Sequence, residues 1–294
     1  MSLQEVISGP SKNFNGVLGV AIKHLGSGER ADLKGDRLFP TASVFKVPVI
    51  VELYRQVEAG TLNLDDQIIL REEDKVPGSG ILKELSDGMS VSLRDLLNLM
   101  MIVSDNTATD IIVRRVGMDN VNNSLIELGF TKTKVTKYCR EMLFDLVGIN
   151  DLSLEEMTIE LYEKASEARI YTGSWSLGVD DNNVTTPNEM NTLLELIKMG
   201  KAASRESCED ILRIMAKCQT GSYRIPKYLP QRELILQRKT GSLPGIRNDV
   251  GILTTKKTGS QYILSCFTMD AEDVYAAEEA IAVVSRDVYQ YFNG

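Results

Sequence analysis

The sequence of 294 residues lacks the features that mark a membrane protein or a metalloprotein. It has no run near the roughly 18 uninterrupted apolar residues of a membrane-spanning helix. Its single histidine and its four cysteines form neither a Cys-x-x-Cys spacing nor a Cys/His cluster, so no metal and no other cofactor is expected. The cysteines are also too few and too scattered for a disulfide scaffold. We expect buried free thiols at all four positions: Cys139, Cys208, Cys218 and Cys266.

Clustered positive charge is lacking as well. The 33 Lys and Arg residues are outnumbered by 41 Asp and Glu residues, and the formal net charge is -8. A surface that binds a polyanion needs clustered Lys and Arg, so nucleic acid is not an expected partner. The N-terminus from Met1 to Lys12 lacks the apolar core of a signal peptide, and export would need a leader absent from these residues. The 43% hydrophobic content predicts a substantial core in one or two domains.

The patterns that are present place strands at both ends of the chain and helices between them. Extended segments predict strands over 13–22 and 30–39, which a Gly-Ser-Gly turn joins, and over 234–237, 250–253 and 262–268. Helical periodicity predicts helices over 44–59, 93–103, 107–116, 120–128 and 271–292. The capping boxes Ser153-Leu-Glu-Glu156 and Thr186-Pro-Asn-Glu189 predict two further helix starts.

This arrangement predicts an α+β fold of two domains. Because both ends of the chain carry strands, residues 13–40 and 225–294 are expected to form one α/β domain. It would be a sandwich whose antiparallel sheet has flanking N- and C-terminal helices. Residues 41–224 would then form an inserted all-α domain.

A candidate nucleophile lies at the opening of the helix expected over 44–59. Ser43 and Lys46 are three residues apart, so their side chains share one face of a helix. A serine hydroxyl needs a neighbouring base, and a lysine amine can serve when burial and nearby positive charge lower its pKa. Taken alone, this spacing favours a plainer interpretation, an N-cap serine followed by a surface lysine.

Two further motifs change that interpretation. Ser104-Asp105-Asn106 directly follows an apolar run, and Lys239-Thr240-Gly241 lies at the end of a predicted strand. Together with Ser-x-x-Lys they form the signature of class A β-lactamases and penicillin-binding proteins. The order of the motifs also fits, since a helix start is followed by an interhelical loop and then by a strand edge.

The sequence thus resembles the class A β-lactamase family and its penicillin-binding relatives from Asn13 to the C-terminus. Neighbouring segments also look like sequence segments of that family, among them Phe39-Pro-Thr-Ala-Ser43 and Gly241-Ser-Leu-Pro-Gly-Ile-Arg-Asn-Asp-Val-Gly251. The resemblance implies a serine β-lactamase-like fold with the active site in the cleft between the two domains. It also implies a serine hydrolase that β-lactams or similar amides acylate.

The resemblance further implies a role for each motif residue. Ser43 would attack the carbonyl, Lys46 would relay its proton, and Ser104 would pass a proton to the leaving nitrogen. The implied substrate-binding residues are Asn106, Lys239, Thr240, Gly241 and Ser242. Of these, Asn106 would hold the substrate's amide, and Lys239 with Thr240 would bind its carboxylate. The backbone N–H groups of Ser43 and Ser242 would form the oxyanion hole.

The sequence departs from the family in the loop that should carry the deacylation base. The family's β-lactamases have Glu-x-x-Leu-Asn there, and this pattern is missing. The nearest candidate is Glu141, with Glu155 and Glu156 as less favoured rivals. The following segment, 145–184, is longer than the family's usual loop, and its Trp175 either lines the cleft or anchors a core. We therefore expect inefficient deacylation.

Several alternatives stay open beside this hydrolase. The chain could be a penicillin-binding peptidase, an esterase or amidase acting on a non-lactam substrate, or a non-catalytic ligand-binding sensor. The expected partner is a small β-lactam or peptide-like amide, and the oligomeric state stays open. The family resemblance indicates an extracytoplasmic location. A Ser-His-Asp triad is not expected, because the one histidine, His24, falls on a strand of the N-terminal hairpin.

Overall fold

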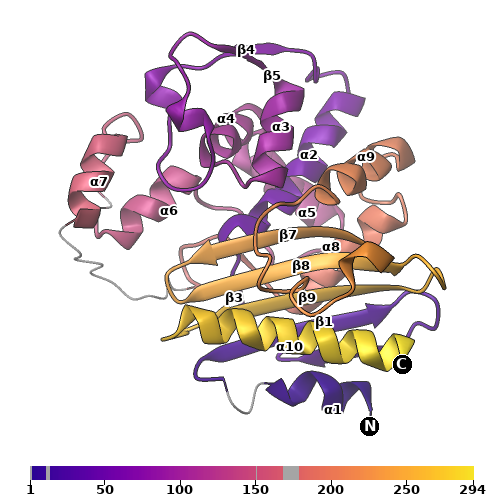
Figure 1. Cartoon of the computed structure of the whole chain (residues 1–294). Coiled ribbons are helices and arrows are strands. Elements are labelled where there is room, and N and C mark those ends of the chain that lie inside the picture. The colour runs from indigo at the N-terminus through magenta and orange to yellow at the C-terminus, as the bar shows by residue number, and fades with distance from the viewer. Residues whose placement is uncertain (1, 11–13, 150, 168–178) are drawn as a thin grey trace.

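The computed structural model describes residues 2–10, 14–149, 151–167 and 179–294, and in it the two ends of the chain meet in one sheet (Figure 1). The sheet has five strands in the order β2-β1-β9-β8-β7, and neighbouring strands are antiparallel. The strands are Val17–His24 (β1), Arg30–Leu33 (β2), Leu234–Leu243 (β7), Ile246–Thr255 (β8) and Gln261–Met269 (β9). The predicted antiparallel sheet made from both ends is confirmed.

Both faces of this sheet are buried, because successive side chains of a strand point to opposite faces. On β9, Cys266 packs in a cluster with the helices Leu3–Ser8 (α1) and Val274–Asn293 (α10), whereas the next residue, Phe267, joins the larger helical core. α1 and α10 lie along one face of the sheet, and Pro187–Lys198 (α8) lies behind the other (Figure 1). The sheet is therefore covered on both sides, as the α+β prediction requires.

The remaining helices gather beyond the α8 face, where four of them pack around α2 and the last two before β6 lie to one side (Figure 1). They are Lys46–Glu58 (α2), Leu93–Ile102 (α3), Asn106–Val116 (α4), Met118–Glu127 (α5), Cys139–Leu146 (α6), Ile159–Glu167 (α7) and Arg205–Met215 (α9). The first nine residues of α2, from Lys46 to Tyr54, are all buried. This part also contains two small antiparallel sheets of two strands each: Phe39–Pro40 (β3) with Val184–Thr185 (β6), and Gln67–Ile69 (β4) with Ser90–Ser92 (β5).

Three predictions of local structure differ from the structure. The second strand ends at Leu33, because Lys34 adopts a left-handed conformation with φ of 52°. The Glu156 carboxylate does accept a hydrogen bond from Ser153 N at 2.9 Å, yet this closes only a turn, and α7 begins at Ile159. Helix α6 was not predicted. Trp175 lies outside the described residues.

The cysteines are free, as expected, but only three of them are buried. Cys218 is half-buried, and its Sγ approaches Thr220 Oγ1 at 3.4 Å. Within the described ranges, no group of His, Cys, Asp and Glu is arranged to hold a metal ion. None of the helices described is both long and apolar enough to span a bilayer.

Candidate functional site

Ser43 lies on a strained turn that leads into α2. It belongs to the short 3-10 helix Ala42–Phe45, and the residue before it, Ala42, has a φ of 44°. Non-glycine residues in this left-handed region cost free energy and persist only where the surroundings fix them. Here Asn248 Nδ2 donates to Pro40 O at 2.9 Å and to Thr41 O at 3.0 Å. The turn is thus clamped from β8, and the strained backbone presents Ser43.

Lys46 follows one turn later and is completely buried. Its ammonium nitrogen donates to Ser104 O at 2.9 Å, Ser104 Oγ at 3.1 Å and Asn106 Oδ1 at 3.1 Å. A protonated lysine has three donors, and all three have acceptors. Burial lowers the pKa of Lys46, although the nearby carboxylates of Asp110 and Asp105 oppose this shift, so Lys46 loses its proton more easily than an exposed lysine does.

Ser104 connects the two lysines of the site. Lys239 Nζ donates to Ser104 Oγ at 2.9 Å and to Thr240 O at 2.8 Å, so both ammonium groups meet at one hydroxyl. Burial lowers the pKa of Lys239 to about 7, and the charge of Lys46 adds to the effect. Ser104 itself has a φ of 60°, which makes it the second strained residue of the site. A proton can pass along Lys46, Ser104 and Lys239 without large movement.

The middle residue of the second motif organises the neighbouring loop. The Asp105 carboxylate caps α4 by accepting from Ala108 N at 2.9 Å. It also accepts from Ile81 N at 2.7 Å and Leu82 N at 2.9 Å. Asn106 N donates to Ser79 O at 2.9 Å. These bonds fix the loop that carries Ser79 beside the active-site cavity.

Strand β7 approaches the nucleophile turn so closely that a glycine is required. A Cβ added at Gly241 would lie 2.4 Å from Thr41 O and 3.1 Å from Ser43 N. Real Cβ atoms do not come this close to a carbonyl oxygen, so the approach depends on Gly241. It brings the backbone of Ser242 next to that of Ser43, as an oxyanion hole needs. Thr240, between Lys239 and Gly241, shares a 2.5 Å hydrogen bond with Thr220.

Arg224 supports this strand and was not predicted. It is buried, and Nη1 donates to Gly241 O at 3.0 Å and Asn248 O at 2.8 Å, while Nη2 donates to Ser242 Oγ at 2.5 Å. The sequence around Arg224 contains no motif that could have identified this residue. Only the fold shows that one guanidinium fixes the strand behind the predicted oxyanion hole.

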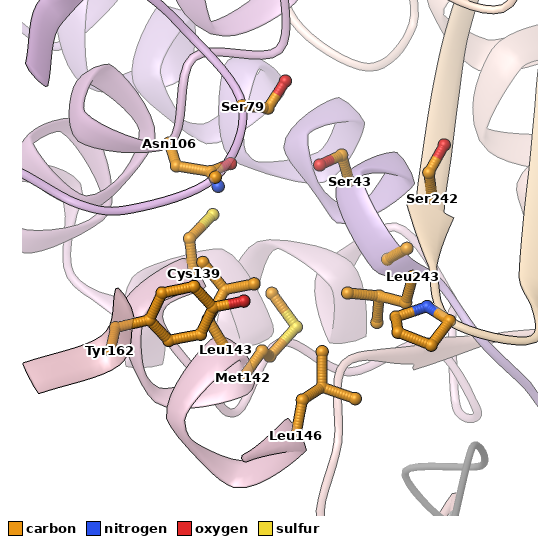
Figure 2. A pocket seen from close by; sticks show the side chains of 13 residues that line it. Ser43, Ser79, Asn106, Cys139, Met142, Leu143, Leu146, Tyr162, Ser242 and Leu243 are labelled. Carbon is orange, nitrogen blue, oxygen red and sulfur yellow. The ribbon is translucent and has the colours of Figure 1, made fainter. Parts of the chain in front are cut away.

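Ser43, Asn106 and Ser242 line a cavity of about 190 Å³, with Lys46, Ser104 and Lys239 directly behind it. Figure 2 shows that its lining divides into two halves. The upper half in this view carries Ser43, Ser79, Asn106 and Ser242. The opposite half is formed mainly by α6 and carries Cys139, Met142, Leu143 and Leu146.

Glu141, the candidate deacylation base, is not among the described residues that line this cavity. α6 begins at Cys139, and the Glu141 carboxylate turns back to accept from Tyr138 N at 2.7 Å. Glu155 and Glu156 are also absent from the described lining. The first of the four α6 residues that line the cavity is Cys139, and burial raises the pKa of its thiol. A neutral thiol stands where the sequence led us to expect a carboxylate.

The start of α6 is held from α4 by Asp110. This buried carboxylate accepts from Cys139 N at 2.7 Å and from Arg140 N at 3.0 Å. Arg140 in turn donates to the backbone oxygens of Glu73, Lys75 and Leu154. Burial raises the pKa of Asp110 to about 6, although the two N–H groups and Lys46 favour the carboxylate. Asp110 thereby fixes the position of Cys139 in the cavity.

Comparison with known proteins agrees with this site. Residues 2–292 match the sequence model of the beta-lactamase enzyme family. Beta-lactamase VEB-1 of Pseudomonas aeruginosa is 25% identical over 293 residues, which cover 96% of this chain and 87% of the relative. A crystal structure of a β-lactamase from Sphaerobacter thermophilus DSM 20745 is 30% identical, with a TM-score of 0.80 and coverage of 98% of this chain and 96% of that one.

A second similar structure is a point mutant of PBP-A in an acyl-enzyme complex with penicillin-G. It is 24% identical, with a TM-score of 0.79 and coverage of 99% of this chain and 95% of that one. At this identity the similarity shows a shared fold. The predicted resemblance and fold class are therefore confirmed, and with them a hydrolase of the serine β-lactamase type. The chain belongs to the beta-lactamase enzyme family.

Proposed function

We propose that this protein is a hydrolase in which Ser43 is acylated by β-lactams and that the resulting ester is released slowly. The observation that carries the proposal is the divided cavity. All the groups that acylation needs converge on its polar half, whereas Cys139 and apolar side chains occupy the half from which a water would have to be activated. The cavity therefore supplies the groups for acylation but not a base for deacylation.

Acylation uses the polar half. Ser43 Oγ attacks the lactam carbonyl as its proton passes to the unprotonated form of Lys46, which the lowered pKa of this lysine makes more accessible, and the new oxyanion is stabilised by the N–H groups of Ser43 and Ser242. Breaking of the C–N bond leaves a nitrogen that needs a proton. Ser104 Oγ supplies it and is reprotonated from Lys46, to which it is already hydrogen-bonded at 3.1 Å. The product is an ester on Ser43, and Lys46 is neutral again.

Deacylation needs a base that deprotonates a water next to this ester. General-base catalysis contributes about 10²–10⁴-fold, and the base must lie within hydrogen-bonding reach of the water. Among the described residues, those that line the cavity include no Asp, Glu or His. The thiol of Cys139 has a raised pKa and is protonated at neutral pH, so it cannot replace a carboxylate. The acyl-enzyme should accumulate.

Mass spectrometry of the intact protein over time, after mixing with benzylpenicillin or a chromogenic cephalosporin, tests the proposal. The expected result is rapid gain of one ring-opened β-lactam, followed by slow loss, with a burst of absorbance in the chromogenic assay. Ser43→Ala should abolish the adduct. Ser79→Ala, a second serine of the same cavity, should still form it.

Two results would contradict the proposal in different ways. An adduct on the Ser43→Ala variant would show that the nucleophile is another residue. Steady turnover with no detectable adduct would show that deacylation is fast, and slow release would then be wrong while Ser43 could keep its role.

A further inference from the structure

A hollow of about 530 Å³ lies at the sheet edge farthest from the motif residues. β2 forms one edge of the five-stranded sheet, and β7, which carries Lys239, forms the other, so four strand spacings of about 4.8 Å separate them. We call it the edge hollow, and side chains of β1, β2 and α8 form most of its lining. Sites for small molecules commonly measure about 300–1,000 Å³. The acylation proposed for Ser43 gives the edge hollow no role.

We propose that the edge hollow binds a short peptide of about two residues as a zwitterion with free termini. Arg30 holds the peptide carboxylate, Asp32 holds its ammonium group, and the amide of Asn191 accepts from its backbone N–H. The inference is independent of the proposed function, because none of the described residues that line the hollow takes part in acylation.

Arg30 carries a positive charge that its neighbours do not balance. It lies directly opposite Lys23 in the ladder between β1 and β2, and like charges in opposite positions destabilise a pair of strands. Lys23 is paired with Glu195 of α8 at 2.6 Å, whereas Arg30 has no ion pair among the described residues. A ligand carboxylate, bound by two parallel N–H···O bonds, would balance the remaining charge.

The amide of Asn191 is the second unsatisfied group of the edge hollow. This side chain lines the hollow from α8 and is only 8% exposed. Its Oδ1 has no hydrogen-bond partner among the described residues. Because a buried acceptor without a donor is unfavourable, a ligand that brings an N–H group to Asn191 gains binding energy there.

The neighbours of Asn191 on α8 already have partners. Asn188, Asn191 and Glu195 are three and four residues apart, so they share one face of the helix. Asn188 Nδ2 donates to Asp36 Oδ1 at 3.3 Å, and the Glu195 carboxylate accepts from Lys23. Thr192 Oγ1 donates to Asn188 O at 2.9 Å. Among the described α8 residues of the lining, Asn191 is therefore the one left to a ligand.

The spacing of the two charges on β2 matches a dipeptide. Arg30 and Asp32 stand on the α8 side of the strand, because Ala31 and Leu33 pack against the cluster of α1 and α10 on the other side. Two residues along a strand span about 7 Å, and so do two residues of an extended peptide. Gly35 N donates to Asp32 Oδ1 at 3.0 Å, which orients this carboxylate and leaves its second oxygen for an ammonium group.

Isothermal titration calorimetry with L-alanyl-L-alanine as the probe tests the proposal. The parent protein should bind it with a dissociation constant of about 1 mM or lower. N-acetyl-L-alanyl-L-alanine lacks the ammonium group, and L-alanyl-L-alaninamide lacks the carboxylate. Each should bind at least about tenfold more weakly, because hydrogen bonds between charged groups are the strong ones.

Three variants connect binding to the edge hollow. Arg30→Gln should weaken binding of the dipeptide by about tenfold or more, because glutamine has no charge to offer the carboxylate. Asn191→Leu should weaken it severalfold and should keep the fold, since it has a similar size and removes a buried group without a partner. Arg37→Gln, at an exposed arginine outside the lining, is the matched control and should bind like the parent. Thermal unfolding checks that each variant is folded.

Hydrogen exchange locates the bound peptide. L-alanyl-L-alanine should slow exchange in residues 30–33 and 188–195 and leave 239–243 unchanged. Protection of 239–243 instead would place the peptide in the active-site cavity and overturn the inference. Absence of saturable binding to the parent up to about 10 mM would also overturn it. Equal weakening by Arg30→Gln and Arg37→Gln would assign the effect to net charge, with the same consequence.

Discussion

The two halves of the cavity are built by opposite means. On the polar half, each ammonium donor of Lys46 has a named acceptor, and Lys239 shares the Ser104 hydroxyl with it. On the other half, α6 presents a thiol and apolar side chains, and it is positioned by one buried carboxylate, that of Asp110. A dense polar network fixes its members more firmly than apolar packing does, because each lost bond leaves a buried group unsatisfied.

This difference indicates which step of the reaction the protein supports. Behind the polar half, Lys46, Ser104 and Lys239 are joined by hydrogen bonds of 2.9 to 3.1 Å. The half that would activate a water has no base among its described residues and is lined by a thiol and mainly apolar side chains. This difference can be tested by disabling the polar half or by adding a base to the half formed by α6.

The largest expected effect is that of Lys46→Arg. An arginine stays protonated at neutral pH and cannot accept the Ser43 proton, so the acylation rate should fall by roughly 10²–10⁴-fold. Stopped-flow acylation by benzylpenicillin measures it. Lys23→Arg, at a lysine paired with Glu195 outside the site, is the control. A Lys46→Arg rate within about threefold of the parent would show that Lys46 is not the base.

Giving the second half a base should have the next largest effect. Cys139→Glu places a carboxylate at a position of α6 that lines the cavity, and the lifetime of the acyl-enzyme should fall by about 10²-fold or more. Cys139→Gln has the same length but cannot accept a proton, so it should keep the long lifetime. Glu141→Gln should also leave the lifetime unchanged. A shorter or longer lifetime in Glu141→Gln would return that residue to the mechanism.

Loosening the attachment of α6 should have a local effect. Asp110→Ala leaves the buried N–H groups of Cys139 and Arg140 without an acceptor, at a cost of about 1–3 kcal/mol for each group. Hydrogen exchange across 139–146 should therefore quicken by about tenfold or more, while exchange in α10 stays unchanged. Asp287→Ala, which removes a surface ion pair with Arg286, is the control. Unchanged exchange in α6 would show that Asp110 does not hold it.

The smallest expected effect is a pH dependence of substrate capture. Because burial and the charge of Lys46 lower the pKa of Lys239 to about 7, its ammonium is present below that pH and is lost above it. Capture of a carboxylate-bearing penicillin, measured as the acylation rate at low substrate concentration, should fall by up to about tenfold per pH unit above about 7. Lys239→Arg should move this decline to higher pH, and the methyl ester of the same penicillin should not show it. An identical decline for the ester would assign the titration to another group.

The polar half could be predicted from the sequence because each of its parts is a short local motif. Ser-x-x-Lys, Ser-Asp-Asn and Lys-Thr-Gly carry their chemistry within three or four residues, and the surrounding helix and strand patterns show where each one lies. The extended apolar segments at both ends, with a turn signal between the first two, also predict one antiparallel sheet. These predictions depend on neighbours in the sequence, which a single chain displays.

The second half could not be predicted because its geometry depends on contacts between distant residues. The start of α6 at Cys139 is fixed by Asp110, 29 positions earlier. Spacing alone favoured Glu141 as the residue in reach of the ester. In the same way, Arg224 donates hydrogen bonds to Gly241 and Ser242 of β7, which lie 17 and 18 positions later in the sequence. No local sequence pattern indicates these contacts. The Ser153 capping box formed its hydrogen bond but no helix, because one capping bond does not offset the cost of nucleation.

The pairing of β1 with β9 also bears on how the protein is made. Val17 lies opposite Met269, and the clamp on the Ser43 turn comes from Asn248 on β8. During synthesis on a ribosome, the segment with Ser43 emerges long before the strands that hold it. The reactive turn can acquire its strained shape only after translation has passed the third motif, so an unfinished chain should show no reactivity toward β-lactams. Contacts of such long range are also the kind that slow folding.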